Sequence, residues 1–280
     1  MPTLTAHQDV TTQTVRAGGT AFSYRDLGPR TGTPVVFLNH LAANLDNWDP
    51  RVVDGIAAHR RVITFDNRGV GASEGSTPKT IAGMAQDAVA FIRSLDLRHV
   101  DLLGFSMGGF VAQVIAEKEP ELVRRMILAG TGPAGGEGID KVTALTLLDV
   151  ARGALTLRDA KYYLFFTGTP HGRSEARAFL ARLAERSVGR DTSVSVPSFR
   201  AHLTAIHRWG VQQPTDLSQI QHPVLVANGD HDRMVPSHNS VDLARRLPNA
   251  RLTIYPDAGH GGIFQHHAQF VPEAVEFLDD

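Results

Sequence analysis

The feature that most constrains the fold of this chain is an alternation of short apolar runs with amphipathic helical segments. The apolar runs occupy residues 34–38, 61–65, 100–103, 126–129 and 223–227, and a further strand pattern covers 251–255. A strand that is buried on both faces of a parallel sheet has this continuous apolar character. The helical patterns between the runs, such as 81–95 and 107–117, predict right-handed crossovers and therefore a mostly parallel, doubly wound α/β sheet.

The stretches outside this alternation predict the domain organisation. Residues 12–24, with a Gly-Gly pair near their centre, predict a hairpin ahead of the sheet. Residues 134–216 show helical periodicity and no central-strand pattern. One helix face there combines Ala176, Phe179, Leu180, Leu183 and Ala184. In a chain of 280 residues we therefore expect one α/β core, formed by 1–133 and 217–280, with 134–216 inserted as a helical cap.

The composition excludes several classes of protein. The 28 Lys and Arg residues nearly balance the 29 Asp and Glu residues, so no overall field favours nucleic acid or an anionic membrane. No apolar run approaches the roughly eighteen residues of a membrane span. The absence of cysteine excludes disulfides, thiolate metal sites and a Cys nucleophile. We expect a cytoplasmic protein whose partner is a small-molecule substrate, with no nucleic-acid or membrane partner; the sequence leaves its oligomeric state open.

One segment departs from this neutral balance. Residues 151–210 contain ten Lys or Arg residues and four Asp or Glu residues, an excess of six positive charges. One interpretation is that these side chains lie on solvated helix faces. The other is a positive lid that favours anionic substrates by concentrating charge at the entrance of the site.

A candidate nucleophile lies where an apolar run meets a helix pattern. Residues 104–108 read Gly-Phe-Ser-Met-Gly and match G-x-S-x-G, directly after the run 100–103. A sharp strand-to-helix turn forces the central residue into a strained conformation and exposes its hydroxyl group. The turn leaves room only for small residues two positions before and after the serine, and both are glycine. This context predicts Ser106 as a nucleophile.

A serine nucleophile needs a base and an acid, which this type of sheet places on later loops in the order Ser, Asp, His. His260 follows the last strand pattern on a Gly-bounded loop, and we predict it as the base. Two acids, Asp230 and Asp232, compete on the loop after 223–227. We expect no metal site, because the chain lacks Cys, H-E-x-x-H and suitably spaced carboxylates, and no cofactor, because a single G-x-G is no dinucleotide motif.

Acyl transfer also requires donors for the oxyanion, usually two backbone N–H groups. We expect Met107, the residue after the nucleophile, to supply one, and the loop 39–43 after the first parallel run to supply the other.

Together these motifs resemble the α/β-hydrolase fold of serine hydrolases. The matching segments are 39–48, 66–73, 104–109, 229–236 and 258–260. The group that the chain resembles most contains the 3-oxoadipate enol-lactonases and the cofactor-free haloperoxidase-esterases. The resemblance implies that Asp232, in a D-x-x-x-P step, is the acid. From turn chemistry we expect Asp230 to cap the turn through its own backbone. The resemblance also assigns the second oxyanion donor to Leu41.

The chain departs from this family in the oxyanion loop. Where many members have His-Gly, it has Asn39 and His40. The ring of His40 either hydrogen-bonds within the loop or touches the substrate. Trp209, with the aromatic run 162–166, falls in the predicted cap; we regard it as a candidate substrate contact, although packing against the sheet is the alternative.

The resemblance implies an ester or lactone hydrolase that works through an acyl-enzyme on Ser106. The same triad can run perhydrolysis or carbon–carbon bond hydrolysis, and some members of the family act as slow ligand receptors, so these alternatives stay open. The sequence does not specify the acyl or alcohol group of the substrate.

Overall fold

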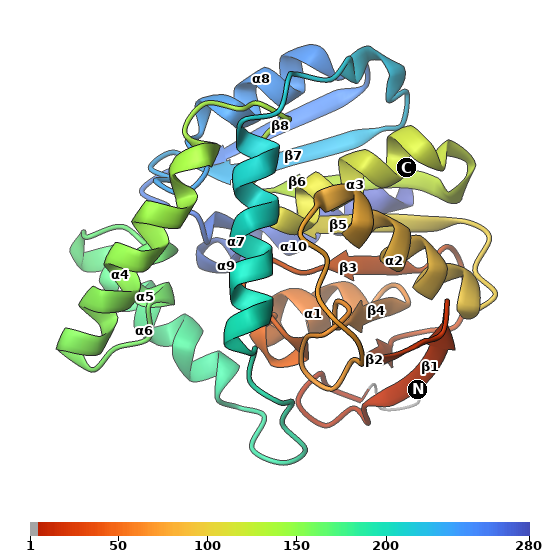
Figure 1. Cartoon of the computed structure of the whole chain (residues 1–280), viewed down its shortest axis with the longest axis horizontal. Coiled ribbons are helices and arrows are strands. Elements are labelled where there is room, and N and C mark those ends of the chain that lie inside the picture. The colour runs from red at the N-terminus through yellow and green to blue at the C-terminus, as the bar shows by residue number, and fades with distance from the viewer. Residues whose placement is uncertain (1–4) are drawn as a thin grey trace.

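The computed structural model describes residues 5–280, which form one eight-stranded sheet in the order β1-β2-β4-β3-β5-β6-β7-β8 (Figure 1). The strands are β1 (Gln13–Ala17), β2 (Thr20–Leu27), β3 (Val35–Leu38), β4 (Val62–Phe65), β5 (Val100–Phe105), β6 (Val123–Ala129), β7 (Val224–Gly229) and β8 (Ala250–Tyr255). The hairpin β1–β2 is antiparallel and joins β4, whereas β3 to β8 are parallel to one another. The predicted sheet and hairpin are confirmed.

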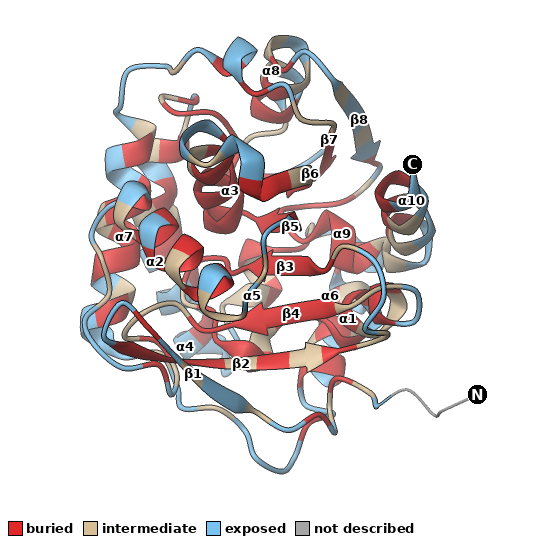
Figure 2. Cartoon of the chain, turned by 90° about the vertical axis from the view of Figure 1, so that its right-hand side faces the viewer, coloured by how far each residue is buried: buried red, intermediate tan, exposed pale blue. Residues whose placement is uncertain are grey.

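The apolar runs are explained by burial on both faces of the sheet. Every residue of β3, β4, β5 and β7 is buried. Helices α2 (Ile81–Ser94) and α3 (Met107–Lys118) lie on one face, and α1 (Pro50–Ala57) and α10 (His267–Asp279) lie on the other (Figure 2). Because β3 to β8 are parallel, the loops that follow them lie at one edge of the sheet, where ligands bind in open α/β sheets.

The chain between β6 and β7 forms helices, and the described residues contain no strand there. From residue 139 to residue 210 these elements are η3 (Ile139–Lys141), α4 (Val142–Thr156), α5 (Lys161–Leu164), α6 (Pro170–Leu183) and α7 (Val196–Gly210). Figure 1 shows them in green and teal at one end of the strands. In α6, Ala176, Phe179 and Leu183 are buried as the periodicity indicates, but Ala184 is exposed because the helix ends at Leu183. The division into core and cap stays a prediction.

The remaining elements are short or peripheral. They are η1 (Leu45–Asn47), η2 (Pro120–Leu122), η4 (Leu217–Gln219), α8 (His238–Arg246) and α9 (Gly262–Gln265). Across residues 5–280, none of the helices combines the length and the apolar character that crossing a membrane requires.

Two buried arginines, Arg182 in α6 and Arg186 just after it, contact segments near the start of the chain. Arg182 forms a two-pronged ion pair with Asp49, at 3.0 and 2.7 Å. Arg186 donates to the carbonyl groups of His7, Gln8 and Val10 at 3.0–3.2 Å. Both arginine residues are only 8% exposed. For these two residues the expectation of solvated helix faces is wrong, because the guanidinium groups satisfy buried carboxylate and carbonyl oxygens. Seven of the other eight basic residues are exposed: Arg152, Arg158, Arg173, Arg177, Arg190, Arg200 and Arg208.

Candidate active site

Ser106 lies on a strained turn between β5 and α3. Its backbone has φ 56° and ψ −118°, a conformation that residues other than glycine rarely adopt. A Cβ atom on Gly104 would collide with the backbone of Gly108 and Gly109, and one on Gly108 would collide with the Leu38 carbonyl group. The two glycines therefore allow the close approach of β3, β5 and α3 that fixes this turn.

His260 and Asp232 form a buried hydrogen-bonded pair. His260 Nδ1 lies 2.7 Å from Asp232 Oδ2, and both side chains are at most 1% exposed. Asp232 Oδ1 accepts the backbone N–H groups of Met234 and Val235 at 2.8 and 3.0 Å. Since a carboxylate only accepts, Nδ1 of His260 carries the hydrogen, and Nε2 is left as the proton acceptor. This tautomer is the one that a general base for a serine requires.

Asp230 has a different position from the one expected. It does not cap its own turn: Oδ1 accepts the Ala258 N–H at 3.1 Å and contacts the His231 ring at 2.6 Å. Asp230 thus joins the loop after β7 to the loop that presents His260. Its distance in sequence from Ala258 explains why local turn chemistry could not predict this contact.

Ser106 and His260 line the same inner cavity, which has a volume of about 100 Å³. Within residues 5–280 the Ser106 hydroxyl has no hydrogen-bond partner, so its bond to His260 is not formed in this state. Catalytic hydrogen bonds of this kind are often long before substrate binds. The ring of His260 packs against Phe105 and Phe165, with centroids 5.0 and 5.5 Å apart.

Two backbone N–H groups near Ser106 in the chain or in the cavity have no acceptor within residues 5–280. Met107 is the first residue of α3, so its N–H has no partner inside the helix. The Leu41 N–H likewise donates to no residue in the described chain. Asn39 fixes the start of this loop, because its side chain donates to the Phe65 carbonyl at 2.8 Å and accepts from Trp48 at 2.6 Å. Leu41 lines the same cavity as Ser106, and Met107 follows Ser106 directly at the start of α3.

His40 hydrogen-bonds within its own loop. Its Nδ1 lies 2.9 Å from the Leu41 carbonyl oxygen, and its ring packs between Phe105 and Phe165. The ring also lines the inner cavity. Burial, with a smaller contribution from the charge of Lys161, lowers the pKa of His40 to about 3. The imidazole is therefore neutral over the physiological range.

Trp209 is not among the residues that line the inner cavity. Its ring stacks on Phe110 with centroids 5.3 Å apart, and its Nε1 donates to the Gly132 carbonyl at 3.4 Å. The side chain is 3% exposed. Trp209 packs α7 onto α3, which is the alternative role considered for it.

Several cavity residues could not be found from the sequence. Thr146, Lys161 and Phe199 come from α4, α5 and α7, and Met234 comes from the loop after Asp232. The hydroxyl of Thr146 is buried and has no hydrogen-bond partner within residues 5–280. Helical periodicity alone marks the segments that contain Thr146, Lys161 and Phe199, and it carries no information about which side chain reaches the site.

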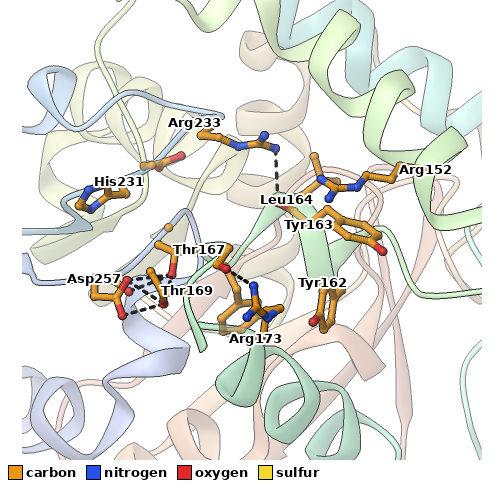
Figure 3. Close-up of a pocket in the computed structure, with 14 residues that line it drawn as sticks. Arg152, Tyr162, Tyr163, Leu164, Thr167, Thr169, Arg173, His231, Arg233 and Asp257 are labelled. Carbon is orange, nitrogen blue, oxygen red and sulfur yellow. Dashed lines mark hydrogen bonds between the residues drawn. The ribbon is translucent and has the colours of Figure 1, made fainter. Parts of the chain in front are cut away.

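A second, outer cavity of about 820 Å³ lies beside the first. Leu164 lines both cavities, whereas Phe165 lines the inner one and Phe166 the outer one. Figure 3 shows Arg152, Arg173 and Arg233 around the outer cavity. Arg233 pairs with Asp149 and so connects the loop after β7 to α4.

No group of three or more His, Asp or Glu side chains within residues 5–280 is arranged to hold a metal ion. The cluster of His266 and His267 near His260 is accounted for otherwise. His266 stacks on Tyr255 with centroids 5.1 Å apart and contacts the Pro256 carbonyl. His267 contacts the Phe264 carbonyl at 3.1 Å.

Comparison with known proteins agrees with this architecture. The family model of the α/β hydrolase fold matches residues 33–267. The chain belongs to the α/β hydrolase family. It is 29% identical over 277 residues to a non-heme chloroperoxidase of Streptomyces lividans, covering 93% of this chain and 96% of the relative.

Solved structures show the same relationship. An α/β hydrolase fold protein from Chitinophaga pinensis superposes with a TM-score of 0.94 at 39% identity, covering 99% of this chain and all of the other. The enol-lactonase of Burkholderia xenovorans LB400 has a TM-score of 0.77 at 22% identity over 96% of this chain and all of its own, which is a likeness of fold. The resemblance to the α/β hydrolase family is confirmed.

Proposed function

We propose that this protein is a serine hydrolase that cleaves a small carboxylic ester or lactone through an acyl-enzyme on Ser106. The observation that carries the proposal is the buried hydrogen bond between His260 and Asp232, which leaves Nε2 of His260 as a proton acceptor. His260 lines the same cavity as Ser106, whose backbone is strained. Membership of the α/β hydrolase family supports the proposal.

The proposed reaction has two steps. His260 takes the proton of Ser106 as the hydroxyl oxygen attacks the carbonyl carbon, and it then gives this proton to the leaving oxygen. Asp232 holds the imidazole and stabilises its charge. The Leu41 and Met107 N–H groups stabilise the oxyanion, and water activated by His260 releases the acid.

The cavity supports a small substrate. A volume of about 100 Å³ has room for a short acyl group. Thr146, Lys161 and Phe199 close it from the segment between β6 and β7, which is why we assign residues 134–216 as a cap that selects the substrate. Only one of the ten basic residues in 151–210, Lys161, lines this cavity.

The test is intact-mass analysis after fluorophosphonate treatment, with hydrolysis of p-nitrophenyl acetate measured in parallel. We expect one adduct and turnover in the wild type, and neither in Ser106→Ala, because loss of the nucleophile in such triads lowers kcat by about 10⁶-fold. An adduct that persists in Ser106→Ala, or a wild type that gives neither adduct nor turnover, would contradict the proposal.

Perhydrolysis is the second candidate, supported by the similarity to the Streptomyces lividans chloroperoxidase. In that reaction hydrogen peroxide replaces water, attacks the acyl-enzyme and releases a peracid, so the first step and its residues are the same. Peracid formation from acetate and hydrogen peroxide, compared with ester hydrolysis by the same preparation, distinguishes the two activities.

A further inference from the structure

The peptide bond between Leu41 and Ala42 is held at both ends by imidazole groups. His40 Nδ1 lies 2.9 Å from the Leu41 carbonyl oxygen. The Ala42 N–H donates to Nδ1 of His202 at 3.2 Å. His202 lies on α7, 160 residues further along the chain, and its side chain is fully buried. A side chain from the segment between β6 and β7 thus contacts the loop that offers the Leu41 N–H.

These contacts specify the hydrogen on each ring. A carbonyl oxygen only accepts, so His40 carries its hydrogen on Nδ1; a backbone N–H only donates, so Nδ1 of His202 has a lone pair. Burial lowers the pKa of His202 to about 4, and that of His40 to about 3. Both rings are therefore neutral near pH 7, the only state in which His202 can accept at Nδ1.

The loop needs such support because its backbone is strained. Ala42 has φ 55°, a left-handed conformation that favours glycine. Without an acceptor for the Ala42 N–H, the torsions ψ of Leu41 and φ of Ala42 can change and relieve this strain. Because the chain is continuous, such a change shifts the neighbouring His40–Leu41 peptide plane, whose N–H has no acceptor within residues 5–280.

We propose that His202 is a positioning residue for the oxyanion site: by accepting the Ala42 N–H it holds the strained loop so that the Leu41 N–H stays free for the oxyanion. This inference rests on the proposed function, since it assigns a role in that reaction. It gives α7 a part in the chemistry in addition to its part in covering the cavity.

The test replaces the acceptor and then restores it. Removal of a whole oxyanion donor costs about 10²–10³-fold in rate, so we expect His202→Leu to lower kcat for p-nitrophenyl acetate by about 10–100-fold, with KM changed less than about twofold. His202→Asn, whose Oδ1 can accept at the position of Nδ1, should recover most of the lost rate. His207→Leu is the matched control, because His207 is an exposed histidine on the same helix. His202→Ala replaces the Leu variant if that variant does not fold.

A second readout separates positioning from general stability. A trifluoromethyl ketone that forms an oxyanion with Ser106 should bind the His202→Leu variant more weakly in proportion to the loss of kcat/KM. Acetate, the product, should bind equally well. Unchanged kcat in His202→Leu, or equal losses in the Leu and Asn variants, would overturn the inference while wild-type turnover kept the proposed function intact. A wild type with neither turnover nor fluorophosphonate adduct would overturn both.

Discussion

At the scale of single residues, Asp66 has a buried carboxyl group beside a second carboxyl group. Asp66 Oδ1 accepts the Leu45 N–H at 2.8 Å, while its Oδ2 and that of Asp191 are both buried without a donor within residues 5–280. Both oxygens lie so close to Gly71 that a Cβ atom there would collide with them. Burial, and then Asp191, raise the pKa of Asp66 well above its usual value. A proton shared between the two carboxyl groups explains the arrangement.

The sign of the resulting pH dependence follows from this raised pKa. The folded protein holds the Asp66 proton more tightly than the unfolded chain, so stability is lost as pH rises above about 4 and through the folded pKa. In Asp66→Asn the amide donates to Asp191 and has no proton to lose. We expect this variant to be more stable than the wild type at pH 8 by about 1–2 kcal/mol, with a smaller difference at pH 5.

Urea unfolding at the two pH values measures this difference. Glu121→Gln is the control for loss of a negative charge, because Glu121 is exposed. If Asp66→Asn is no more stable than the wild type at pH 8, or if the difference in the free energy of unfolding does not depend on pH, Asp66 and Asp191 do not share a proton.

Some residues of the candidate site could be predicted from the sequence and others could not. Ser106, His260 and the two acids Asp230 and Asp232 follow strand patterns on short loops, so local sequence was enough to select them. His202 could not be predicted, because its contact with Ala42 spans 160 residues and α7 presents histidines on both its buried and its exposed faces. The two roles considered for Trp209 stayed open for the same reason: periodicity predicts a buried face without identifying what covers it.

At the scale of elements, the attachment of α6 depends on the buried pair Arg182–Asp49. Asp49 is fully buried and also accepts the Arg51 N–H at the start of α1. Removing one partner of a buried pair leaves the other charge uncompensated, which costs about 3–5 kcal/mol. We therefore expect Arg182→Met to lower the free energy of unfolding by this amount, measured by urea denaturation.

Arg177→Met serves as the control, because Arg177 is exposed on the same helix. It should change stability by less than about 0.5 kcal/mol. A similar loss in both variants would show that the pair with Asp49 makes no special contribution. The strands and most helices were predictable because each has its own hydrophobic period, but the ion pairs that join them are contacts between distant segments.

At the scale of the whole molecule, three buried histidines make folding sensitive to acid. Burial lowers the pKa of His7 and His40 to about 3 and that of His202 to about 4. The unfolded chain, with values near 6.5, binds more protons between these limits. Stability is therefore lost as pH falls below 6.5 toward the folded pKa, by up to about 1.4 kcal/mol per pH unit for each residue.

His7→Phe isolates one of these contributions. Both ring nitrogens of His7 are buried without partners within residues 5–280, so an apolar ring leaves no polar group unsatisfied. Between pH 6.5 and 4.5 we expect the variant to lose about 2–3 kcal/mol less stability than the wild type. The measurement is chemical denaturation at both values, and parallel losses in the two proteins would contradict it.

Two groups of residues line the inner cavity: some lie within residues 134–216, and the others come from the chain before and after that segment. Ser106, His260 and residues 40–42 come from turns and loops that follow β5, β8 and β3, before and after residues 134–216, whereas Thr146, Lys161 and Phe199 come from one uninterrupted stretch of the chain. Substitutions within that stretch, or its replacement, can therefore change which substrates fit the cavity while Ser106 and His260 stay the same. His202 lies in the same stretch, so an exchanged segment would also have to bring its own acceptor for the Ala42 N–H.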